Sequence, residues 1–294
     1  MNETTVFEAV LAALASGDAF SAETTMKAFP EMGRAVDEKG WTLLHHAVSY
    51  GTVAGFDALL PWSDANAMDL NGGTPLMMAA ALAEEPLIER VLQAGANPLA
   101  VDHAGYSALM YAASAASREA VALLAPLSDA AQATTHNGRD ALMLAAMNGD
   151  EFAWENVQIL LEASDPSKTD VEGHTALTLA ARAGSDGSAE VIWEALPELQ
   201  KQKQGPCAFA LTKSPEHEGI SWNMLDRFAV FAEEEAALAV FKRQGPQGRE
   251  RMPRFAAIQE SRELSRVVAR SAEANGGESA QGPSNAIAAS ARRI

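Results

Sequence analysis

Cysteine is nearly missing from this chain of 294 residues, which has only Cys207. One thiol excludes an intrachain disulfide framework and a metal site built from several cysteines. Long hydrophobic runs are also lacking, and no apolar stretch approaches the length that crosses a bilayer. The opening segment MNETTVFEAVLAALASGDAF has acidic rather than basic residues before its apolar run, which argues against a signal peptide. We therefore expect a cytoplasmic protein with no membrane partner.

Positive charge is scarce, because 22 Lys and Arg residues stand against 39 Asp and Glu residues, a formal net charge of −17. From Lys242 onward there are ten Lys or Arg and five Asp or Glu, a net charge of +5, so the preceding residues carry −22. An acidic body repels nucleic acid, whose binding depends on neutralising phosphates. It favours a protein partner with a basic surface. The basic C-terminal part leaves contact with RNA, with an acidic surface or with the chain's own body open.

The sequence also lacks the common catalytic signatures. It has no phosphate-cradling glycine loop, no nucleophile elbow and no H-E-x-x-H motif. We therefore expect neither an enzyme nor a cofactor.

Internal repetition is what the sequence has in abundance. Five segments read DEKGWTLLHHAVSYG, DLNGGTPLMMAAALA, DHAGYSALMYAASAA, THNGRDALMLAAMNG and DVEGHTALTLAARAG. Their first glycines are Gly40, Gly72, Gly105, Gly138 and Gly173, so the spacings are 32, 33, 33 and 35 residues. A second apolar pattern follows each segment. Repetition at this period indicates a solenoid, in which each unit packs on its neighbours.

This pattern resembles the ankyrin repeat, whose motif is approximately D-x-x-G-x-T-P-L-H-x-A-A-x-x-G, followed by an apolar helix and G-A-D/N-P. The second copy carries Asp69, Gly72, Thr74, Pro75, Leu76, Ala79, Ala80, Gly95, Ala96, Asn97 and Pro98 of this motif. The resemblance implies an all-α solenoid of stacked helix-turn-helix units with hairpin loops and helical caps at both ends. It also implies protein binding on the concave face.

The resemblance defines the domain organisation that we predict. Five repeats occupy residues 37–196, as 37–68, 69–101, 102–134, 135–169 and 170–196. We expect a degenerate capping repeat over 1–36, because solenoids need a polar outer face at their ends. Residues 197–270 are predicted to form a C-terminal helical cap or appendage, with a linker broken at Gly205–Pro206. The composition of residues 271–294 predicts a disordered tail.

Each recurring residue type has a local physical reason. The glycine suits a turn that requires positive φ. A hydroxyl before the first helix can cap its free amides, and this role is predicted for Thr42, Thr74, Ser107 and Thr175. The alanine pairs let neighbouring inner helices approach closely. Copy one has His45 at the motif's histidine, and the methionines that replace it in copies two to four are interpreted as core packing.

Copies four and five both show eight residues, rather than five, between the glycine that ends the first helix and the second apolar pattern. We therefore predict insertions of three residues, which lie within the segments DEFAWEN and SDGSAEV. These insertions are expected to form a ridge along one edge. Trp154 in this ridge is either a partner contact or packed under the turn.

The resemblance places the variable contact positions around the turn glycine and late in the first helix. Such positions include Leu70, Leu82 and Val171 beside aromatic and basic residues. Aromatic residues and arginine most often dominate interfaces. The predicted partner-binding residues are Trp41, Tyr50, His103, Tyr106, His136, Arg139, Met147, Asn148, His174 and Arg182. Trp41 has the alternative of packing on the N-terminal cap.

No metal site is expected from the histidines of the hairpins. His103, His136 and His174 belong to successive copies. Neighbouring hairpins are separated by about 10 Å, roughly one helix diameter, whereas metal–ligand bonds are about 2 Å. The three imidazoles are therefore interpreted as exposed loop residues.

The leading hypothesis is a monomeric, non-catalytic module that binds, and in doing so inhibits or neutralises, a partner protein through its concave face. Two alternatives stay open. The array could present an effector or nucleic-acid-binding activity located in residues 197–294, or the chain could be a secreted effector acting in another cell.

Overall fold

The computed structural model describes residues 3–128, 134–150, 152–211, 221–232, 234–244 and 247–274. Their regular structure is helical, with two isolated antiparallel bridges and no β-strand among the described residues. The predicted all-α fold is thereby confirmed. The chain divides into two compact units, Met1–Ala176 and Leu177–Ile294, which are described separately. In the described part of the chain, no helix is both long enough and apolar enough to cross a bilayer.

The first unit begins with an antiparallel pair of helices, α1 (Glu3–Ala15) and α2 (Ala19–Ala28). Helix α1 buries one stripe of apolar residues, Val6, Val10 and Leu14. Asp18 lies between the helices and caps α2, since its carboxylate accepts the Ser21 N–H at 3.0 Å. A short 3-10 helix, η1 (Pro30–Arg34), leads into the first repeat.

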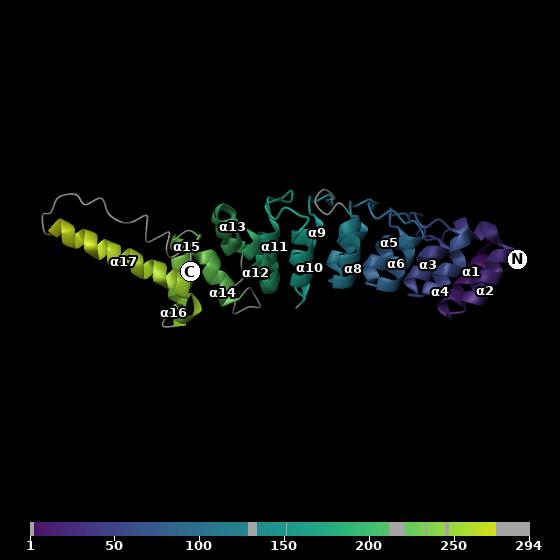
Figure 1. The fold of residues 1–294 in the computed structure, drawn as a ribbon, viewed down its shortest axis with the longest axis horizontal. Coiled ribbons are helices and arrows are strands. Elements are labelled where there is room, and N and C mark those ends of the chain that lie inside the picture. Colours follow the sequence, from purple (N-terminus) through teal and green to yellow (C-terminus); the bar gives the residue numbers. More distant parts are fainter. Residues whose placement is uncertain are drawn as a thin grey trace. The chain divides into compact units, whose positions relative to one another are not determined.

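Four repeats with two helices each follow in the first unit, and Figure 1 shows these pairs succeeding one another in chain order. The inner helices are α3 (Leu43–Ser49), α5 (Pro75–Leu82), α7 (Ala108–Ser114) and α9 (Ala141–Met147). The outer helices are α4 (Val53–Leu59), α6 (Glu85–Gln93), α8 (Arg118–Leu124) and α10 (Ala153–Leu161), with 3-10 turns η2 (Leu60–Trp62) and η3 (Ala125–Leu127). Each inner helix packs on the next, and the alanine pairs 79–80, 112–113 and 145–146 are fully buried between them. Small side chains therefore bring these helices together, as predicted.

A hairpin precedes each inner helix, and we call these hairpins fingers 1 to 5 (residues 37–42, 69–74, 102–107, 135–140 and 170–175). The turn glycines have the predicted positive φ, which is 80° at Gly72 and 83° at Gly173. Gly72 has a second reason to be glycine. A Cβ there would lie 2.9 Å from the ring carbon Cδ2 and 3.0 Å from the backbone nitrogen of His103 in the next finger. At Gly173, no described atom beyond its chain neighbours lies within 4 Å of such a Cβ.

The predicted helix caps are present in the first three copies. The hydroxyls of Thr42, Thr74 and Ser107 each accept the N–H of the residue three positions later. In copy one, His45 completes a capping box and also places Nε2 at 3.2 Å from the Gly73 carbonyl of finger 2. The replacing methionines, Met77, Met110 and Met143, are at most 2% exposed, so they pack in the core.

The insertion predicted for copy five is wrong, whereas that in copy four is confirmed. Helix α12 (Asp186–Ala195) begins 13 residues after Gly173, the same offset as from Gly40 to Val53 in copy one. Its buried Ala189 occupies the position that Phe56, Ile88 and Val121 hold in copies one to three, so a search for large apolar residues placed the second helix too late. Helix α10 does begin later, 15 residues after Gly138, and its buried Val157 lies 19 residues after Gly138, three more than from Gly40 to the buried Phe56 in copy one. Without a second insertion, the predicted ridge does not form, and Trp154 is half-buried within α10.

The second unit contains α11 (Ala176–Ala183), α12, α13 (Glu198–Leu211), α14 (Trp222–Ala229), α15 (Glu234–Arg243), α16 (Gly248–Arg251) and α17 (Pro253–Ala274). The predicted break at Gly205–Pro206 is wrong, because α13 runs through both residues. Gly205 serves close packing instead, since a Cβ there would lie 3.0 Å from Phe231 Cβ and 3.3 Å from the Trp193 ring.

The last helix, α17, is joined to α14 by a buried carboxylate. Asp226 is 1% exposed, and its two oxygens accept the N–H groups of Arg254 and Phe255 at 3.0 and 2.9 Å. It thus caps a helix that begins 27 residues later in the sequence. Farther along α17, Leu264 and Val267 are 66% and 58% exposed. The predicted tail begins at residue 271, whereas α17 continues to Ala274, and residues 275–294 lie outside the described part.

Candidate protein-binding surface

The five fingers are joined by one hydrogen bond per step. In each case, the second residue of a finger donates its N–H to the carbonyl of the third residue of the preceding finger. The four bonds are Leu70 to Lys39, His103 to Asn71, His136 to Ala104 and Val171 to Asn137, with lengths from 2.8 to 3.1 Å. These bonds fix the fingers in register, so equivalent side chains of successive copies line one face of the first unit.

An aspartate at the start of four fingers holds the turn together. In finger 2, Asp69 Oδ1 accepts the N–H groups of Asn71 and Gly73, both at 2.8 Å. Asp170 makes the same two bonds in finger 5, to Glu172 and His174. Burial alone would raise the pKa of Asp170, but these amides and the Arg139 guanidinium hold the pKa below its usual value. The carboxylates are therefore part of what we call the frame, the network of hydrogen bonds that holds the fingers in place.

The second oxygen of each finger aspartate takes a partner from one of two places. In fingers 1 and 3 the partner lies nine residues later, on the finger's own inner helix: His46 for Asp37 at 3.1 Å and Tyr111 for Asp102 at 2.7 Å. In fingers 2 and 5 it follows the turn glycine of the preceding finger. The indole Nε1 of Trp41 thus donates to Asp69 at 3.2 Å, and Arg139 Nε donates to Asp170 at 3.1 Å.

Trp41 and Arg139, both predicted to contact the partner, therefore join neighbouring fingers. Trp41 also lies edge-on to His46, with ring centroids 5.3 Å apart, under the ammonium of Lys39 at 4.9 Å. The Arg139 side chain is 20% exposed. Because both polar groups are already engaged, truncating either side chain would disturb the frame as well as any contact surface.

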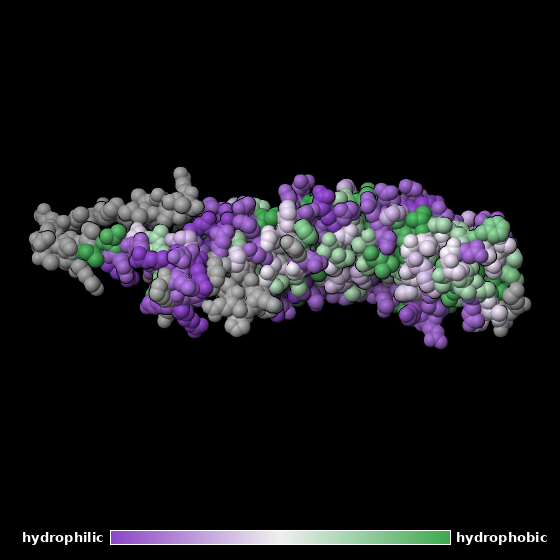
Figure 2. Space-filling view, turned by 90° about the horizontal axis from the view of Figure 1, so that it is seen from below, coloured by the Kyte–Doolittle hydropathy of each residue, from purple (hydrophilic) through white to green (hydrophobic). Residues whose placement is uncertain are grey.

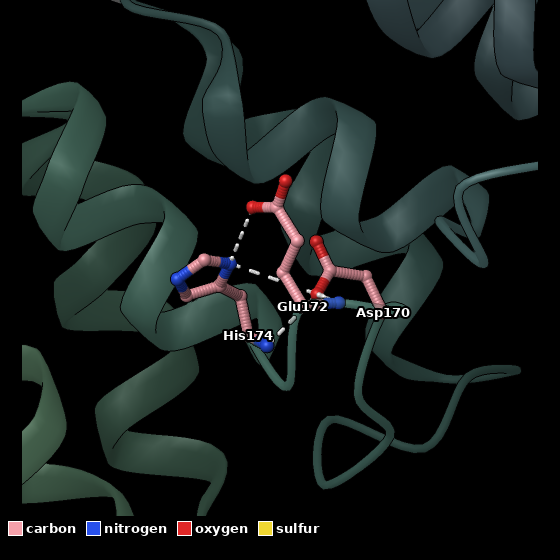
Figure 3. Close-up of side chains that lie close together, drawn as sticks. All are labelled: Asp170, Glu172 and His174. Atoms are coloured by element: carbon pink, nitrogen blue, oxygen red, sulfur yellow. Dashed lines mark hydrogen bonds and ion pairs between the residues drawn. The ribbon is translucent and has the colours of Figure 1, made fainter.

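His174, a third predicted contact residue, lies in a charged cluster with Asp170 and Glu172 (Figure 3). Its Nδ1 is 3.2 Å from Glu172 Oε2 and 3.6 Å from Asp170 Oδ1, both ion pairs when the ring is protonated. Among the described residues, this is the group whose possible ligand atoms lie close enough for a metal ion, within 4.8 Å of one another. The Arg139 cation already occupies one oxygen of Asp170, so we assign the cluster to ion pairing between fingers 4 and 5.

Other predicted contact residues reach the surface. The side chains of His103 and His136 are exposed on fingers 3 and 4, and Arg182 is exposed on α11 of the second unit. Tyr50 is 43% exposed at the end of α3. These residues meet the first requirement for contact with a partner.

Three more predicted contact residues are half-buried. Tyr106 packs its ring on Tyr111, with centroids 5.4 Å apart. Met147 ends α9, and the adjacent Asn148 donates from its amide Nδ2 to the Ser114 carbonyl of the preceding copy at 3.0 Å. These side chains therefore combine a packing role with partial exposure.

Two aliphatic residues on the fingers are more exposed than most of the predicted partner-binding residues. Leu70 is 67% exposed and Val171 is 71% exposed, and each occupies the position whose N–H bonds to the preceding finger. Together with His103 and His136 they form what we call the finger row. Leu82, 47% exposed at the end of α5, matches the place of Tyr50 in copy one. Figure 2 shows apolar side chains among polar ones on one face of the first unit.

The residue just before the finger aspartate was missed by sequence reasoning altogether. Val36, Met68 and Val101 occupy this position in copies one to three, and they are 56%, 57% and 46% exposed. An apolar residue that recurs at one position outside the helices was the available signal.

Copy four exchanges the residue types at two finger positions. It has Thr135 where the other fingers have Asp, and Asp140 where they have Thr or Ser. Asp140 still caps α9, because Oδ1 accepts the Met143 N–H at 2.9 Å. Asp140 is only 1% exposed, however, and its Oδ2 has no hydrogen-bond partner among the described residues. Burial raises the pKa of this carboxyl, although the Met143 amide and Lys168 oppose the shift.

We expect Asp140→Thr to raise the free energy of unfolding at neutral pH by about 1 kcal/mol. The hydroxyl would cap α9 as Thr74 caps α5, without a buried charge. Because the folded-state pKa lies above the unfolded value, the stability contributed by protonated Asp140 is lost as pH rises through the folded pKa. The gain should therefore shrink on acidification, which denaturant titrations at neutral and acidic pH would measure. The reverse exchange, Thr74→Asp, should destabilise at neutral pH, and a pH-independent gain would contradict this explanation.

Comparisons with known proteins agree with this geometry. A family model described as ankyrin repeats in three copies matches residues 44–134 and 109–203. Among solved structures, the chain is similar to the crystal structure of EF0377, an ankyrin repeat protein, at 24% sequence identity and a TM-score of 0.57. That alignment covers 63% of this chain and 96% of the other, and at this identity it shows the fold alone. No curated protein matches the chain.

Ankyrin repeats are generally protein–protein interaction modules and typically non-catalytic, and the comparisons identify no catalytic family. The two overlapping matches span residues 44–203, more than half of the 294 residues, so the chain belongs to the ankyrin-repeat family.

Proposed function

We propose that this chain is a non-catalytic binder that docks a partner protein on the face formed by the fingers and the inner-helix ends, the concave face of an ankyrin array. The finger row of Leu70, His103, His136 and Val171 forms the centre of the contact, and Tyr50 and Leu82 flank it. Binding there would block the partner surface that it covers.

One observation carries this proposal: the backbone of the finger row is fixed while its side chains are exposed. Each of the four amides is bonded to the preceding finger. A partner therefore meets side chains whose main chain is already ordered, which lowers the entropic cost of association. Exposed leucine and valine supply apolar contact area, and the net charge of −22 before Lys242 favours a basic partner surface.

The test is a triple variant, Leu70→Ala with His103→Ala and Val171→Ala. Once affinity capture from the native cell has identified the partner, its dissociation constant should rise at least about tenfold, roughly 1.4 kcal/mol, for the triple variant. The free energy of unfolding should change by less than about 1 kcal/mol, because surface truncations away from caps and cores cost little. Calorimetric titration and denaturant unfolding measure the two quantities.

A matched control uses exposed residues of the outer helices. Gln93→Ala and Gln158→Ala lie on α6 and α10, away from the fingers, and should leave the affinity unchanged. An affinity lost in this control and kept in the triple variant would move the interface to the outer helices and refute the proposal.

A further inference from the structure

A groove of about 640 Å³ lies at the N-terminal end of the first unit, between α1 and finger 1. The side chains of Phe7 and Leu11 line it from α1, and Val36, 56% exposed, lines it from the approach to the finger. Exposed apolar surface inside a concave site favours an occupant that can bury it. This groove is separate from the finger row, which begins in finger 2.

One wall of the groove is already ordered. The Phe7 ring packs edge-on against the His46 imidazole, with centroids 6.0 Å apart. His46 is in turn bonded to Asp37 of finger 1, with 3.1 Å between Nε2 and Oδ2. An occupant would therefore meet a preorganised apolar surface, which reduces the ordering cost of binding.

The finger side of the groove carries an open backbone donor. In fingers 2 to 5, the residue after the first position donates its N–H to the preceding finger. Glu38 is that residue in finger 1, which has no finger before it, and its N–H makes no such bond among the described residues. A peptide carbonyl can therefore extend the series of bonds by one step, as in the pairing of an added strand with an exposed edge.

The charge around the groove selects the kind of occupant. Glu3, Glu8 and Glu38 line it, and no lysine or arginine is among its described lining residues. Lys39, the next residue, is instead held 4.9 Å above the Trp41 ring. Carboxylates around an apolar floor complement a segment that alternates basic and apolar side chains.

We propose that this groove binds an extended basic segment of a partner protein. An apolar side chain of the segment inserts between Phe7 and Val36, a carbonyl accepts the Glu38 N–H, and lysine or arginine side chains pair with Glu3 and Glu8. This second docking site does not depend on the finger row, so either proposal can fail without the other.

The probe is a fluorescently labelled peptide in which lysine and leucine alternate, titrated into the full chain and followed by anisotropy. Glu8→Lys should weaken binding at least about tenfold, since reversing a charge replaces attraction with repulsion. Val36→Thr keeps the β-branched shape but makes the surface polar, and should weaken binding about fivefold. The amide signal of Glu38 should shift on titration in the nuclear magnetic resonance spectrum.

Glu89→Lys is the matched control, because it makes the same change in net charge at an exposed position of the outer helix α6. Its affinity for the peptide should stay within about twofold of the wild type, given screening over a Debye length. Equal losses for Glu8→Lys and Glu89→Lys would reduce the effect to diffuse attraction and overturn the site. A dimer in sedimentation that the peptide dissociates would instead assign the groove to a second copy of this chain, which also overturns the proposal.

Discussion

Gly72→Ala should lower the free energy of unfolding by about 3 kcal/mol or more, from two separate costs. An alanine held at a φ of 80° costs about 1 to 2 kcal/mol. Its Cβ would also lie 3.0 Å from the His103 nitrogen, where no flexible side chain can move aside. Finger 3 must then shift and lose the bond from the His103 N–H to the Asn71 carbonyl. Denaturant unfolding measures the total, and faster hydrogen exchange of the His103 amide identifies the broken bond.

Gly173→Ala separates the two costs, because Gly173 has nearly the same φ, 83°, and no described atom within 4 Å of a new Cβ beyond its chain neighbours. It should cost only the backbone strain, about 1 to 2 kcal/mol. The difference between the two variants is then the cost of crowding the next finger. Equal losses would show that the close approach of the fingers contributes nothing.

Asp226→Ala should destabilise the second unit by about 3 kcal/mol, because hydrogen bonds to a charged group contribute about 1.5 to 3 kcal/mol and a carboxylate at a helix N-terminus adds to this. Removing it leaves the amides of Arg254 and Phe255 without their acceptors, and the Phe255 amide is buried. Helix α17 should detach first. Hydrogen exchange at these two amides would then accelerate well before global unfolding.

Asp226→Asn is the control for this prediction. It keeps one oxygen acceptor and the side-chain shape, so we expect a loss of about 1 kcal/mol. Burial raises the pKa of Asp226 even with both amides bonded to it, so part of the carboxylate's desolvation cost is relieved in the neutral variant. If alanine and asparagine were both as stable as the wild type, the long-range cap would have no energetic role.

The frame could be predicted from the sequence because its rules are local. A turn that needs positive φ selects glycine, and a free helix N-terminus selects Thr42, Thr74 or Ser107, whichever copy they belong to. Repetition at a near-constant period then turns each local preference into a statement about the whole array. Even the exchanged pair in copy four follows these rules, because Asp140 caps its helix in place of threonine.

Predictions failed where tertiary packing overrode a local preference. Gly205 and Pro206 usually interrupt a helix, yet α13 runs through both residues, and Gly205 packs closely against Phe231 and Trp193. In copy five, the small Ala189 is buried where copies one to three have Phe56, Ile88 and Val121. A small side chain in a closely packed position carries little signal in the sequence.

The candidate site was harder to predict for a related reason. Interface statistics favour tryptophan and arginine, but the same hydrogen-bonding capacity lets Trp41 and Arg139 bond the next finger's aspartate. Leu70 and Val171 cannot make such bonds and so stay exposed. An aspartate takes its partner from the preceding finger only when the residue after that finger's turn glycine has a suitable side chain. In finger 2 that residue is Gly73, which has no side chain, so Asp102 of finger 3 bonds Tyr111 of its own copy instead.

The four backbone hydrogen bonds between fingers all run from a later copy to an earlier one and always join the same two finger positions. Such an array is directional, as a polymer is, and its geometry does not depend on which copies are neighbours. Gain or loss of a whole copy would therefore lengthen or shorten the reach of the molecule by one step while preserving the spacing of its contacts.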